Sequence, residues 1–334
     1  MNIAFFETET WEKELFEQAL GDHTLSFSSE PLDRTTLVRH KDAEVLSSFI
    51  YSKLSRDVLS QLPKLTLIAT RSTGVDHIDR AYCSENGIAV RSVPAYGINT
   101  IAEHTFALIL ALSRKIVSSV ERTRRGNFTL DGLRGFELAG KTLGVVGLGS
   151  IGMRVAELAR AFDMGVIVHT RTPKIELENT LGITYVDLPN LLGSADVVSI
   201  HVPLTTETRH LINKDNIKLA KHGSFLVNTA RGGVVETEAI LWALEQGILA
   251  GCGLDVLEEE SALKEERQLL TREFLKTCDL KTQLLNHVLL TKDNVIITPH
   301  NAFNSREALA EIVGKTINTI TSYISGKLKG LVPK

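Results

Sequence analysis

The chain has 334 residues, which at about 150 residues per domain is enough for two domains. With 43% hydrophobic residues, 23% charged residues and a formal net charge of −3, it gives no reason to expect nucleic acid or an anionic membrane as a partner. Its cysteines, Cys83, Cys252 and Cys278, match no disulfide framework and no metal pattern, so we predict no metal site and a reduced compartment. The first residues are acidic where a signal peptide is basic, and the longest apolar run, 106–112, is too short to span a bilayer. We therefore expect a cytoplasmic protein.

The first third of the chain is predicted to alternate between strands and helices. Apolar runs predict strands at 2–6, 43–49, 65–70 and 89–90, and helical stretches at 9–20, 58–62 and 80–85. This alternation predicts a parallel sheet. The turn after the third of these strands, 71–76, offers small residues and backbone N–H groups that could hold a carboxylate. A plain strand-to-helix connection is the simpler interpretation of that turn taken alone.

A domain boundary is predicted at 93–98, where Pro94 and Gly97 interrupt the chain. A helical pattern follows from Thr100 to Arg114 and is apolar on nearly every side. Such a helix is buried either in a large core or in a subunit interface. A fully internal helix and a homodimer contact are therefore both open.

From Leu143 onward the alternation of strands and helices is regular. Strands are expected at 143–146, 166–169, 184–186, 197–201, 224–228, 251–255 and 294–298. An amphipathic helix is predicted after the last strand, and we expect it to pack on the N-terminal domain, which has few elements of its own. Its apolar stripe consists of Leu309, Ile312, Val313, Ile317, Ile320 and Ile324.

A glycine-rich turn at 147–152 (Gly-Leu-Gly-Ser-Ile-Gly) lies between the strand at 143–146 and a helical run. In a dinucleotide-binding turn, Gly147 allows the sharp bend, Gly149 lets the backbone approach a pyrophosphate, and Gly152 lets the helix pack close to the strand. The helix N-terminus then presents N–H groups to the anion. Three glycines at this spacing, between a strand and a helix, predict a dinucleotide site.

Ligands of open parallel sheets bind beyond the carboxyl ends of the strands, so the residues that follow each strand are candidate site residues. Besides the glycine turn, they are Thr170-Arg171, His201-Val202-Pro203, Thr229-Ala230-Arg231-Gly232, Asp255 and Pro299-His300. A guanidinium, a carboxylate and an imidazole opposite a dinucleotide turn are the components of a hydride-transfer site.

These motifs resemble those of the D-isomer-specific 2-hydroxyacid dehydrogenases over nearly the whole chain, from the turn at 72–76 to Phe303. The resemblance rests on the motifs at 147–152, 201–205 (His-Val-Pro-Leu-Thr), 228–232 (Asn-Thr-Ala-Arg-Gly), 253–256 (Gly-Leu-Asp-Val) and 298–300 (Thr-Pro-His). It implies an α/β fold of two Rossmann-like, doubly wound parallel-sheet domains with an active-site cleft between them. Residues 1–99 and 300–334 would form a discontinuous substrate-binding domain, and residues 100–299 the dinucleotide-binding domain.

The resemblance also implies a catalytic triad. Arg231 matches the arginine that holds the 2-keto acid through two hydrogen bonds. His300 matches the acid and base that exchanges a proton with the substrate oxygen. Glu260, five residues beyond Asp255, matches the carboxylate that hydrogen-bonds this histidine and raises its pKa. Glu258 and Glu259 are adjacent, and the spacing from Asp255 favours Glu260.

The family also implies where the substrate binds. The backbone N–H groups of Thr73 and Gly74 would bind the substrate carboxylate. Tyr96 and Phe303 stand where the D-lactate dehydrogenase branch has aromatic residues beside the substrate, and the long connection from Glu260 to His300, including 261–293, also resembles that branch. We expect an oxidoreductase of the pyruvate/D-lactate type. A glyoxylate or hydroxypyruvate reductase of the same family, or a nucleotide-sensing protein like the corepressor relatives, is the alternative.

The cofactor is expected to be NAD(H) or NADP(H), with NADP(H) favoured. An NAD site has Asp or Glu at the end of its second strand, where this chain has Thr170 and Arg171, and an arginine suits a 2′-phosphate. The expected cofactor contacts all follow strands of the second domain. They are Gly147, Gly149, Ser150, Ile151, Gly152, Thr170, Arg171, His201, Val202, Pro203, Thr229, Ala230 and Asp255.

Overall fold

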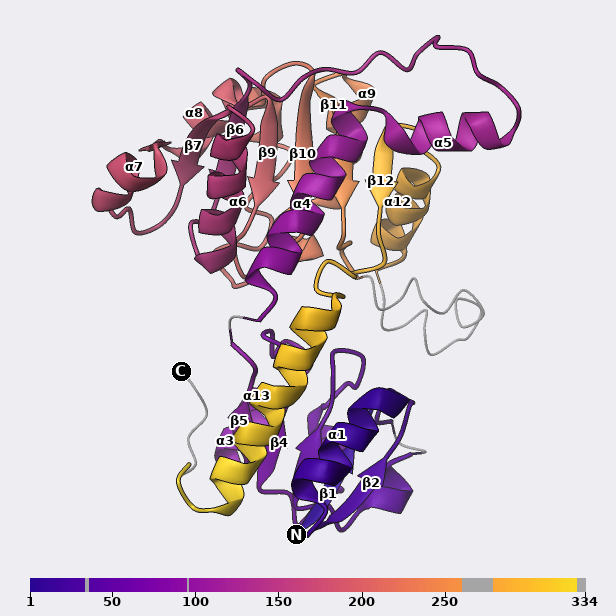
Figure 1. Cartoon of the computed structure of the whole chain (residues 1–334), viewed down its shortest axis with the longest axis vertical. Helices are drawn as coiled ribbons and strands as arrows, with labels where there is room; N and C mark the ends of the chain where they lie inside the picture. Colours follow the sequence, from indigo (N-terminus) through magenta and orange to yellow (C-terminus); the bar gives the residue numbers. More distant parts are fainter. Residues whose placement is uncertain (34–35, 95, 260–278, 329–334) are drawn as a thin grey trace. The chain divides into compact units, whose positions relative to one another are not determined.

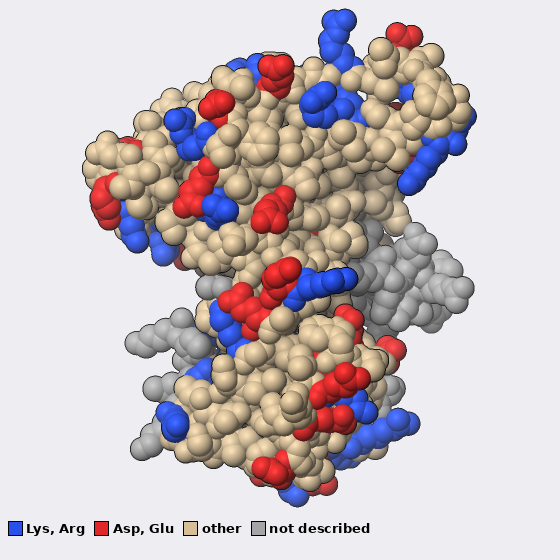
Figure 2. All heavy atoms as spheres, in the orientation of Figure 1, with Lys and Arg blue, Asp and Glu red and all other residues tan. Residues whose placement is uncertain are grey.

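The computed structural model describes residues 1–33, 36–94, 96–259 and 279–328, and the chain divides into two compact units (Figure 1). The first unit contains Met1–Gly97 and the residues from Ser305 onward, and the second unit is Ile98–Asn304. Residues 98–99 and 300–304, which the sequence analysis placed with the substrate-binding domain, thus group with the second unit. On the visible faces of both units, acidic and basic side chains are interspersed (Figure 2).

The first unit is built on a five-stranded parallel sheet with the strand order β2-β1-β3-β4-β5. The strands are β1 (Asn2–Phe5), β2 (Thr24–Phe27), β3 (Val45–Ser47), β4 (Leu67–Ala69) and β5 (Ala89–Arg91). Its helical elements are α1 (Thr10–Leu20), η1 (Leu37–His40), α2 (Arg56–Leu59), α3 (Arg80–Glu85) and α13 (Arg306–Ile324). The edge strand β2 is the one strand here that the sequence analysis did not predict, because its residues are only half-buried.

Helices cover both faces of this first sheet. Side chains alternate between the faces of a strand, so Ile3 and Phe5 belong to one core cluster while Ala4 belongs to another. The face with Phe5 is covered by α1 and by α13, which contributes Val313 and Ile320 and lies beside α1 (Figure 1). The last helix therefore completes the core of the N-terminal sheet.

The second unit is built on a seven-stranded parallel sheet with the order β12-β11-β10-β9-β6-β7-β8. The strands are β6 (Thr142–Val146), β7 (Gly165–His169), β8 (Ile183–Tyr185), β9 (Val197–Ile200), β10 (Ser224–Asn228), β11 (Leu249–Leu254) and β12 (Val295–Ile297). The helical elements are α4 (Ile98–Ser113), α5 (Ile116–Arg124), α6 (Ser150–Ala161), α7 (Glu176–Leu181), α8 (Leu188–Ser194), η2 (Ile217–Leu219), η3 (Gly232–Val234), α9 (Thr237–Glu245) and α12 (Leu280–Leu290). The predicted α/β class with two doubly wound parallel sheets is confirmed.

Helix α4, which the sequence left open between core and interface, packs largely inside the second unit. It lies beside α6 on one face of the sheet (Figure 1) and approaches β11 closely. A Cβ on Gly253 would lie 3.1 Å from Leu108 Cβ and 3.3 Å from Leu112 Cδ1. The following helix, α5, was not predicted, because it has no buried residue and therefore no apolar stripe that faces a core. Among the described residues, none of the helices is apolar over a length that would cross a bilayer.

A buried arginine ties the strands of the first sheet together at their carboxyl ends. Arg71 follows β4 and is 1% exposed. Its Nη2 donates to the carbonyl oxygens of Phe6 and Glu7 at 2.8 and 2.6 Å, and its Nε lies 3.4 Å from Glu12 Oε1 on α1. Burial raises the pKa of Glu12, and the charge of Arg71 opposes that rise.

Replacing Arg71 should therefore destabilise the protein strongly. Arg71→Ala leaves Glu12 buried without its cation and two carbonyl oxygens without their donor, which we expect to lower the free energy of unfolding by about 3–5 kcal/mol. Urea denaturation measures this change. Lys64→Ala, which removes an exposed ion pair with Asp42 at 2.7 Å, is the control and should change little. Equal effects of the two substitutions would contradict the prediction.

Candidate active site

The glycine turn lies at the point where the strand order of the second sheet reverses, between β6 and β9. Gly147 has a φ of +97°, and a Cβ there would lie 2.6 Å from the carbonyl oxygen of His201. A Cβ on Gly152 would lie 2.1 Å from the carbonyl oxygen of Gly147. Gly147 is therefore required by its backbone conformation and by the closeness of His201. Gly152 is required by the close packing of helix against strand.

The N-terminus of α6 is open toward the turn. Gly149 is the N-cap residue, so no side chain caps the helix there, and a Cβ on Gly149 would meet nothing within 4 Å. The first N–H groups of α6 thus have space in front of them and the positive end of the helix dipole behind them. This arrangement fits the pyrophosphate of a dinucleotide.

No carboxylate stands at the described end of β7, which is where an NAD site places one. Thr170 is half-buried and Arg171 is exposed. The nearby acid is Glu207, in the loop after β9. A hydrogen bond from Thr205 lowers the pKa of Glu207 most, and the charge of Arg171 contributes to the same shift. Arg171 thus lies within electrostatic range of an exposed acid.

His201, at the end of β9, is neutral. Its Nε2 lies 2.7 Å from Ser199 Oγ, and desolvation lowers the pKa of the ring to about 3. Its backbone N–H donates to Val146 at 2.7 Å, which joins the end of β9 to the end of β6 beside the glycine turn. Val202 and Pro203 follow it beyond the carboxyl end of β9. Val202 is half-buried and Pro203 is exposed.

The turn after β10 carries Arg231 and is organised by Asn228. The side-chain oxygen of Asn228 accepts from Ala230 N at 3.0 Å, and its side-chain nitrogen donates to the carbonyl oxygen of Arg231 at 2.9 Å. Arg231 Nη1 donates to the carbonyl oxygen of Ala230 at 2.8 Å. Thr229 bonds Thr105 of α4 through their hydroxyl groups at 2.9 Å. The backbone that presents the guanidinium is therefore fixed by local hydrogen bonds.

The turn after β12 carries His300 and is organised by Asp255. Both carboxylate oxygens accept backbone N–H groups, from Asn301 at 3.0 Å and from Ala302 at 2.9 Å, and one also accepts the hydroxyl of Thr298. His300 has a φ of +53°, and its N–H donates to the carbonyl oxygen of Asp255 at 2.9 Å. A non-glycine residue in this conformation is strained, so the turn has to be held by its surroundings.

Asp255 is 1% exposed and is ionised at neutral pH. Burial opposes its ionisation, but hydrogen bonds from His104, Thr298 and the N–H groups of Ala302 and Asn301 outweigh that effect and lower its pKa. The sequence analysis did not single out His104, whose Nε2 lies 3.5 Å from Asp255 Oδ1 and 3.1 Å from Thr298 Oγ1. No local sequence signal marks it, because its partners are distant in the chain.

The remaining predicted residues lie in both units or outside the described residues. In the first unit, Thr73 Oγ1 donates to the carbonyl oxygen of Val93 at 2.9 Å, the carbonyl oxygen of Gly74 accepts from Ser72 Oγ at 2.6 Å, and Tyr96 is buried. In the second unit, Phe303 is half-buried. Glu260 and most of the 261–293 segment lie outside the described residues.

Two Rossmann-type sheets, one of them with a glycine turn at its switch point, define a dinucleotide-binding α/β protein. Residues 106–302 match the family described as D-isomer specific 2-hydroxyacid dehydrogenase, NAD binding domain. The 2-hydroxyacid dehydrogenase homolog 1 of Schizosaccharomyces pombe is 37% identical and covers 97% of both chains. The glyoxylate reductase of Aeropyrum pernix is 34% identical, over 97% of this chain and 88% of its own length.

Solved structures give the same assignment. The D-lactate dehydrogenase of Aquifex aeolicus, complexed with NAD and lactic acid, has a TM-score of 0.86 and 38% identity, over 97% of this chain and 96% of that one. The pyruvate reductase of Chlamydomonas reinhardtii has a TM-score of 0.86 and 33% identity, over 98% and 97%. The chain belongs to the D-isomer specific 2-hydroxyacid dehydrogenase family, as its motifs predicted, and the protein is an oxidoreductase.

The neutral state of His201 predicts a pH dependence of stability. An unfolded histidine has a pKa of about 6.5, against about 3 in the folded protein. Between these values the unfolded chain binds more protons, so the free energy of unfolding should fall as the pH drops below about 6.5, by at most about 1.4 kcal/mol per pH unit.

Urea denaturation of the cofactor-free protein between about pH 6.5 and 5.5 measures this slope, above the range in which most carboxylates titrate. His201→Gln should flatten it, whereas His222→Gln, at an exposed position, should leave it as in the wild type. An unchanged slope in His201→Gln would disprove the prediction.

Proposed function

We propose that the protein reduces 2-keto acids with a small, apolar side chain, such as pyruvate, to D-2-hydroxy acids with a nicotinamide cofactor. The observation that carries this proposal is the placement of Arg231 and His300. Arg231 follows β10, and the turn of His300 is bonded to Asp255 at the end of the neighbouring strand β11. Both residues therefore lie at the carboxyl ends of the strands, on the same side of the sheet as the glycine turn. An anion-binding guanidinium and a proton-exchanging imidazole are what a 2-keto acid requires beside a hydride donor.

In this proposal each residue has a distinct role. Arg231 binds the carboxylate and the carbonyl oxygen of the keto acid, which aligns the carbonyl carbon and withdraws charge from its oxygen. His300 donates a proton to that oxygen as the alcohol forms, and accepts it in the reverse direction. The reduced nicotinamide, when bound, supplies the hydride. Asp255 keeps the His300 turn in place through its backbone N–H bonds, and its predicted contact with the cofactor stays a prediction.

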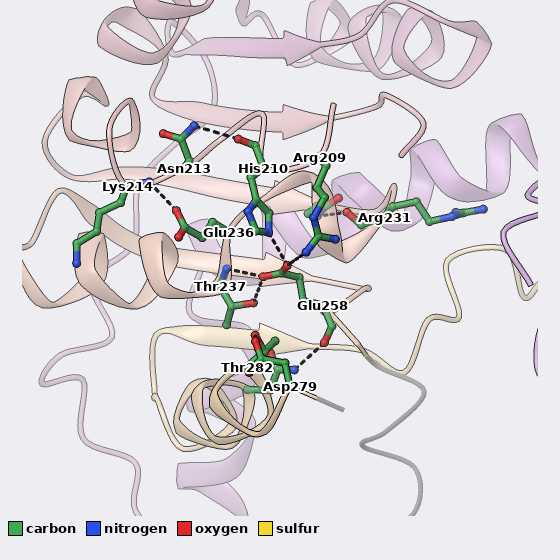
Figure 3. Close-up of polar contacts among 12 residues, drawn as sticks. Arg209, His210, Asn213, Lys214, Arg231, Glu236, Thr237, Glu258, Asp279 and Thr282 are labelled. Atoms are coloured by element: carbon green, nitrogen blue, oxygen red, sulfur yellow. Dashed lines mark hydrogen bonds and ion pairs between the residues drawn. The ribbon is translucent and has the colours of Figure 1, made fainter. Parts of the chain in front are cut away.

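The partner of the His300 imidazole is proposed to be Glu260. The described part of the acidic run supports this choice, because Glu258 has other partners. Glu258 is buried, with His210 Nε2 2.6 Å from its Oε1 and Thr237 donating to its Oε2 (Figure 3). The carboxylate of Glu258 is thus already hydrogen-bonded to His210 and to the start of α9. The spacing from Asp255 remains the argument for Glu260.

The substrate class is proposed from predicted substrate contacts in both units and from the relatives. Backbone N–H groups of Thr73 and Gly74 would bind the substrate carboxylate, and Tyr96 and Phe303 would enclose a short apolar chain. The solved D-lactate dehydrogenase and pyruvate reductase relatives support pyruvate. The glyoxylate reductases among the relatives, such as that of Pyrococcus furiosus at 35% identity, favour glyoxylate as the second candidate.

Turnover assays test the function directly. Oxidation of NADH and NADPH would be followed with pyruvate, phenylpyruvate, hydroxypyruvate and glyoxylate. His300→Asn should lower kcat by about 100-fold or more while cofactor affinity stays near the wild-type value. Arg231→Lys should lower kcat/KM by about 10- to 100-fold, because the lysine loses one of two charge-assisted bonds. Cofactor binding without turnover of any keto acid would sink the enzyme proposal and favour a nucleotide-sensing protein.

We further propose that NADP(H) is accepted and preferred. The absence of an acid at the described end of β7 and the exposed guanidinium of Arg171 support a site for the 2′-phosphate. Arg171→Ala should raise KM for NADPH by about tenfold and leave KM for NADH nearly unchanged. Lys174→Ala, in the same exposed connection, is the control. A wild-type enzyme with a strong preference for NADH would contradict the proposal.

A homodimer is proposed from the exposed apolar side chains that follow α4. Ile116, Val117 and Val120 of α5 are 41–50% exposed, and Phe128 and Leu130 beyond it are 78% and 82% exposed. Apolar side chains gathered in this way favour a protein interface. Sedimentation should show a dimer that Val120→Lys combined with Leu130→Lys converts to monomer. Ile175→Lys, at the exposed residue before α7, a helix at the other end of the second unit (Figure 1), should leave the dimer intact. A monomeric wild type would disprove this assembly.

A further inference from the structure

A buried carboxylate outside the proposed triad lies beside the turn of Arg231. Glu258 is 8% exposed, and both of its carboxylate oxygens are hydrogen-bonded (Figure 3). The N–H and the hydroxyl of Thr237 each donate to Oε2 at 2.9 Å, and His210 Nε2 donates to Oε1 at 2.6 Å. Thr237 begins α9, so the carboxylate also sits at the positive end of a helix. Both oxygens of the buried Glu258 carboxylate therefore have hydrogen-bond partners within the second unit.

His210 is held in one position by its backbone. It has a φ of +49°, which non-glycine residues rarely adopt. Its N–H donates to the carbonyl oxygen of Gly233 at 2.9 Å, and its own carbonyl oxygen accepts from Asn213 Nδ2 at 3.1 Å. The backbone of His210 therefore bonds directly to the turn that carries Arg231, while its ring bonds to Glu258.

The Arg231 turn is supported from two sides. On one side, a Cβ on Gly232 would lie 2.0 Å from the carbonyl carbon of Leu257 and 2.4 Å from Glu258 N, so the turn packs directly against the 257–258 backbone. On the other side, the N–H of Ile212 donates to the carbonyl oxygen of Val234 at 3.2 Å, in addition to the bond from His210. The contact between His210 and Glu258 joins these two supports, although the residues are 48 positions apart.

We propose that His210 and Glu258 are positioning residues that hold the turn 231–233, and through it the guanidinium of Arg231, in the orientation that binds a 2-keto acid. This inference rests on the proposed role of Arg231. Figure 3 shows the Arg231 side chain directed away from Glu258, so the pair acts through the backbone of the turn and not by contact with the substrate.

Substrate binding should respond to this pair and cofactor binding should not. A two-bond guanidinium contact depends on position, and a shift of about 1 Å in such a group can cost about 100-fold in rate. The glycine turn follows β6, which is separated from β10 by β9 in the sheet. Loss of the His210–Glu258 bond thus moves the supports of Arg231 and leaves the supports of the dinucleotide turn in place.

Three variants isolate the contact. His210→Asn keeps a residue type that tolerates positive φ, but its side chain is too short to reach Glu258. His210→Gln restores a donor of greater reach and is the rescue variant. Arg209→Ala is the matched control, because Arg209 Nη2 lies 3.9 Å from the same oxygen of Glu258 on a side chain that is 62% exposed.

The readouts are steady-state kinetics with pyruvate, the Kd of oxamate (a pyruvate isostere that is not reduced) for the NADPH-loaded protein, and the Kd of NADPH itself. In His210→Asn we expect kcat/KM for pyruvate to fall and Kd for oxamate to rise about tenfold or more, with the Kd of NADPH changed less than about twofold. His210→Gln should recover most of the loss, and Arg209→Ala should match the wild type. Hydrogen exchange at the N–H of Val234, which bonds the carbonyl oxygen of Arg231 at 3.2 Å, should be faster in His210→Asn.

The outcomes separate this inference from the function on which it rests. A wild type that neither reduces keto acids nor binds oxamate would overturn the proposed function. A wild type that does both, with kcat/KM and oxamate Kd unchanged in His210→Asn, would overturn the positioning role alone. An equal loss of NADPH affinity in His210→Asn would also overturn it, because the contact would then support the domain in general and not Arg231.

Discussion

The site of the second unit depends on the ionised carboxylate of Asp255. A parallel sheet orders the backbone only as far as the ends of its strands, and His300 lies beyond the end of β12 in a strained conformation. Asp255 supplies the missing order by accepting hydrogen bonds from Thr298 and from the N–H groups of residues 301 and 302. The contact of His104 with the same carboxylate joins α4 to this turn. One buried charge thus connects β11, β12, α4 and the proposed proton donor.

Most of the fold could be predicted because buried parallel strands form continuous apolar runs. The strands of the second sheet lie within one or two residues of their predicted bounds, and the glycine turn stands between β6 and α6 as its spacing indicated. The elements that were missed are those that bury little. Strand β2 is half-exposed at the edge of its sheet, and α5 buries no residue, so neither has the apolar pattern on which such a prediction depends.

The side chains at the strand ends could be named from the sequence, but not the contacts that hold them. His104 and Thr298 are 194 positions apart and His210 and Glu258 are 48 apart, and each pair meets only because the sheet brings its segments together. Nothing local distinguishes such a residue from a solvated one, and Glu258 belongs to an acidic run that looks like an exposed face. Motifs mark the groups proposed to meet the substrate, whereas packing alone reveals the residues that support them.

The path of the chain imposes an order on the synthesis of the protein. The second unit is one continuous stretch, Ile98–Asn304, but the core beneath α1 includes Val313 and Ile320 of α13 together with Phe5 and Phe16. A ribosome releases the N-terminal sheet before the second unit and α13 after it. That sheet therefore keeps part of one apolar face uncovered while the whole second unit is translated, and nascent chains in such a state are prone to aggregate unless chaperones shield them. The core of the N-terminal sheet is complete only when α13 has emerged.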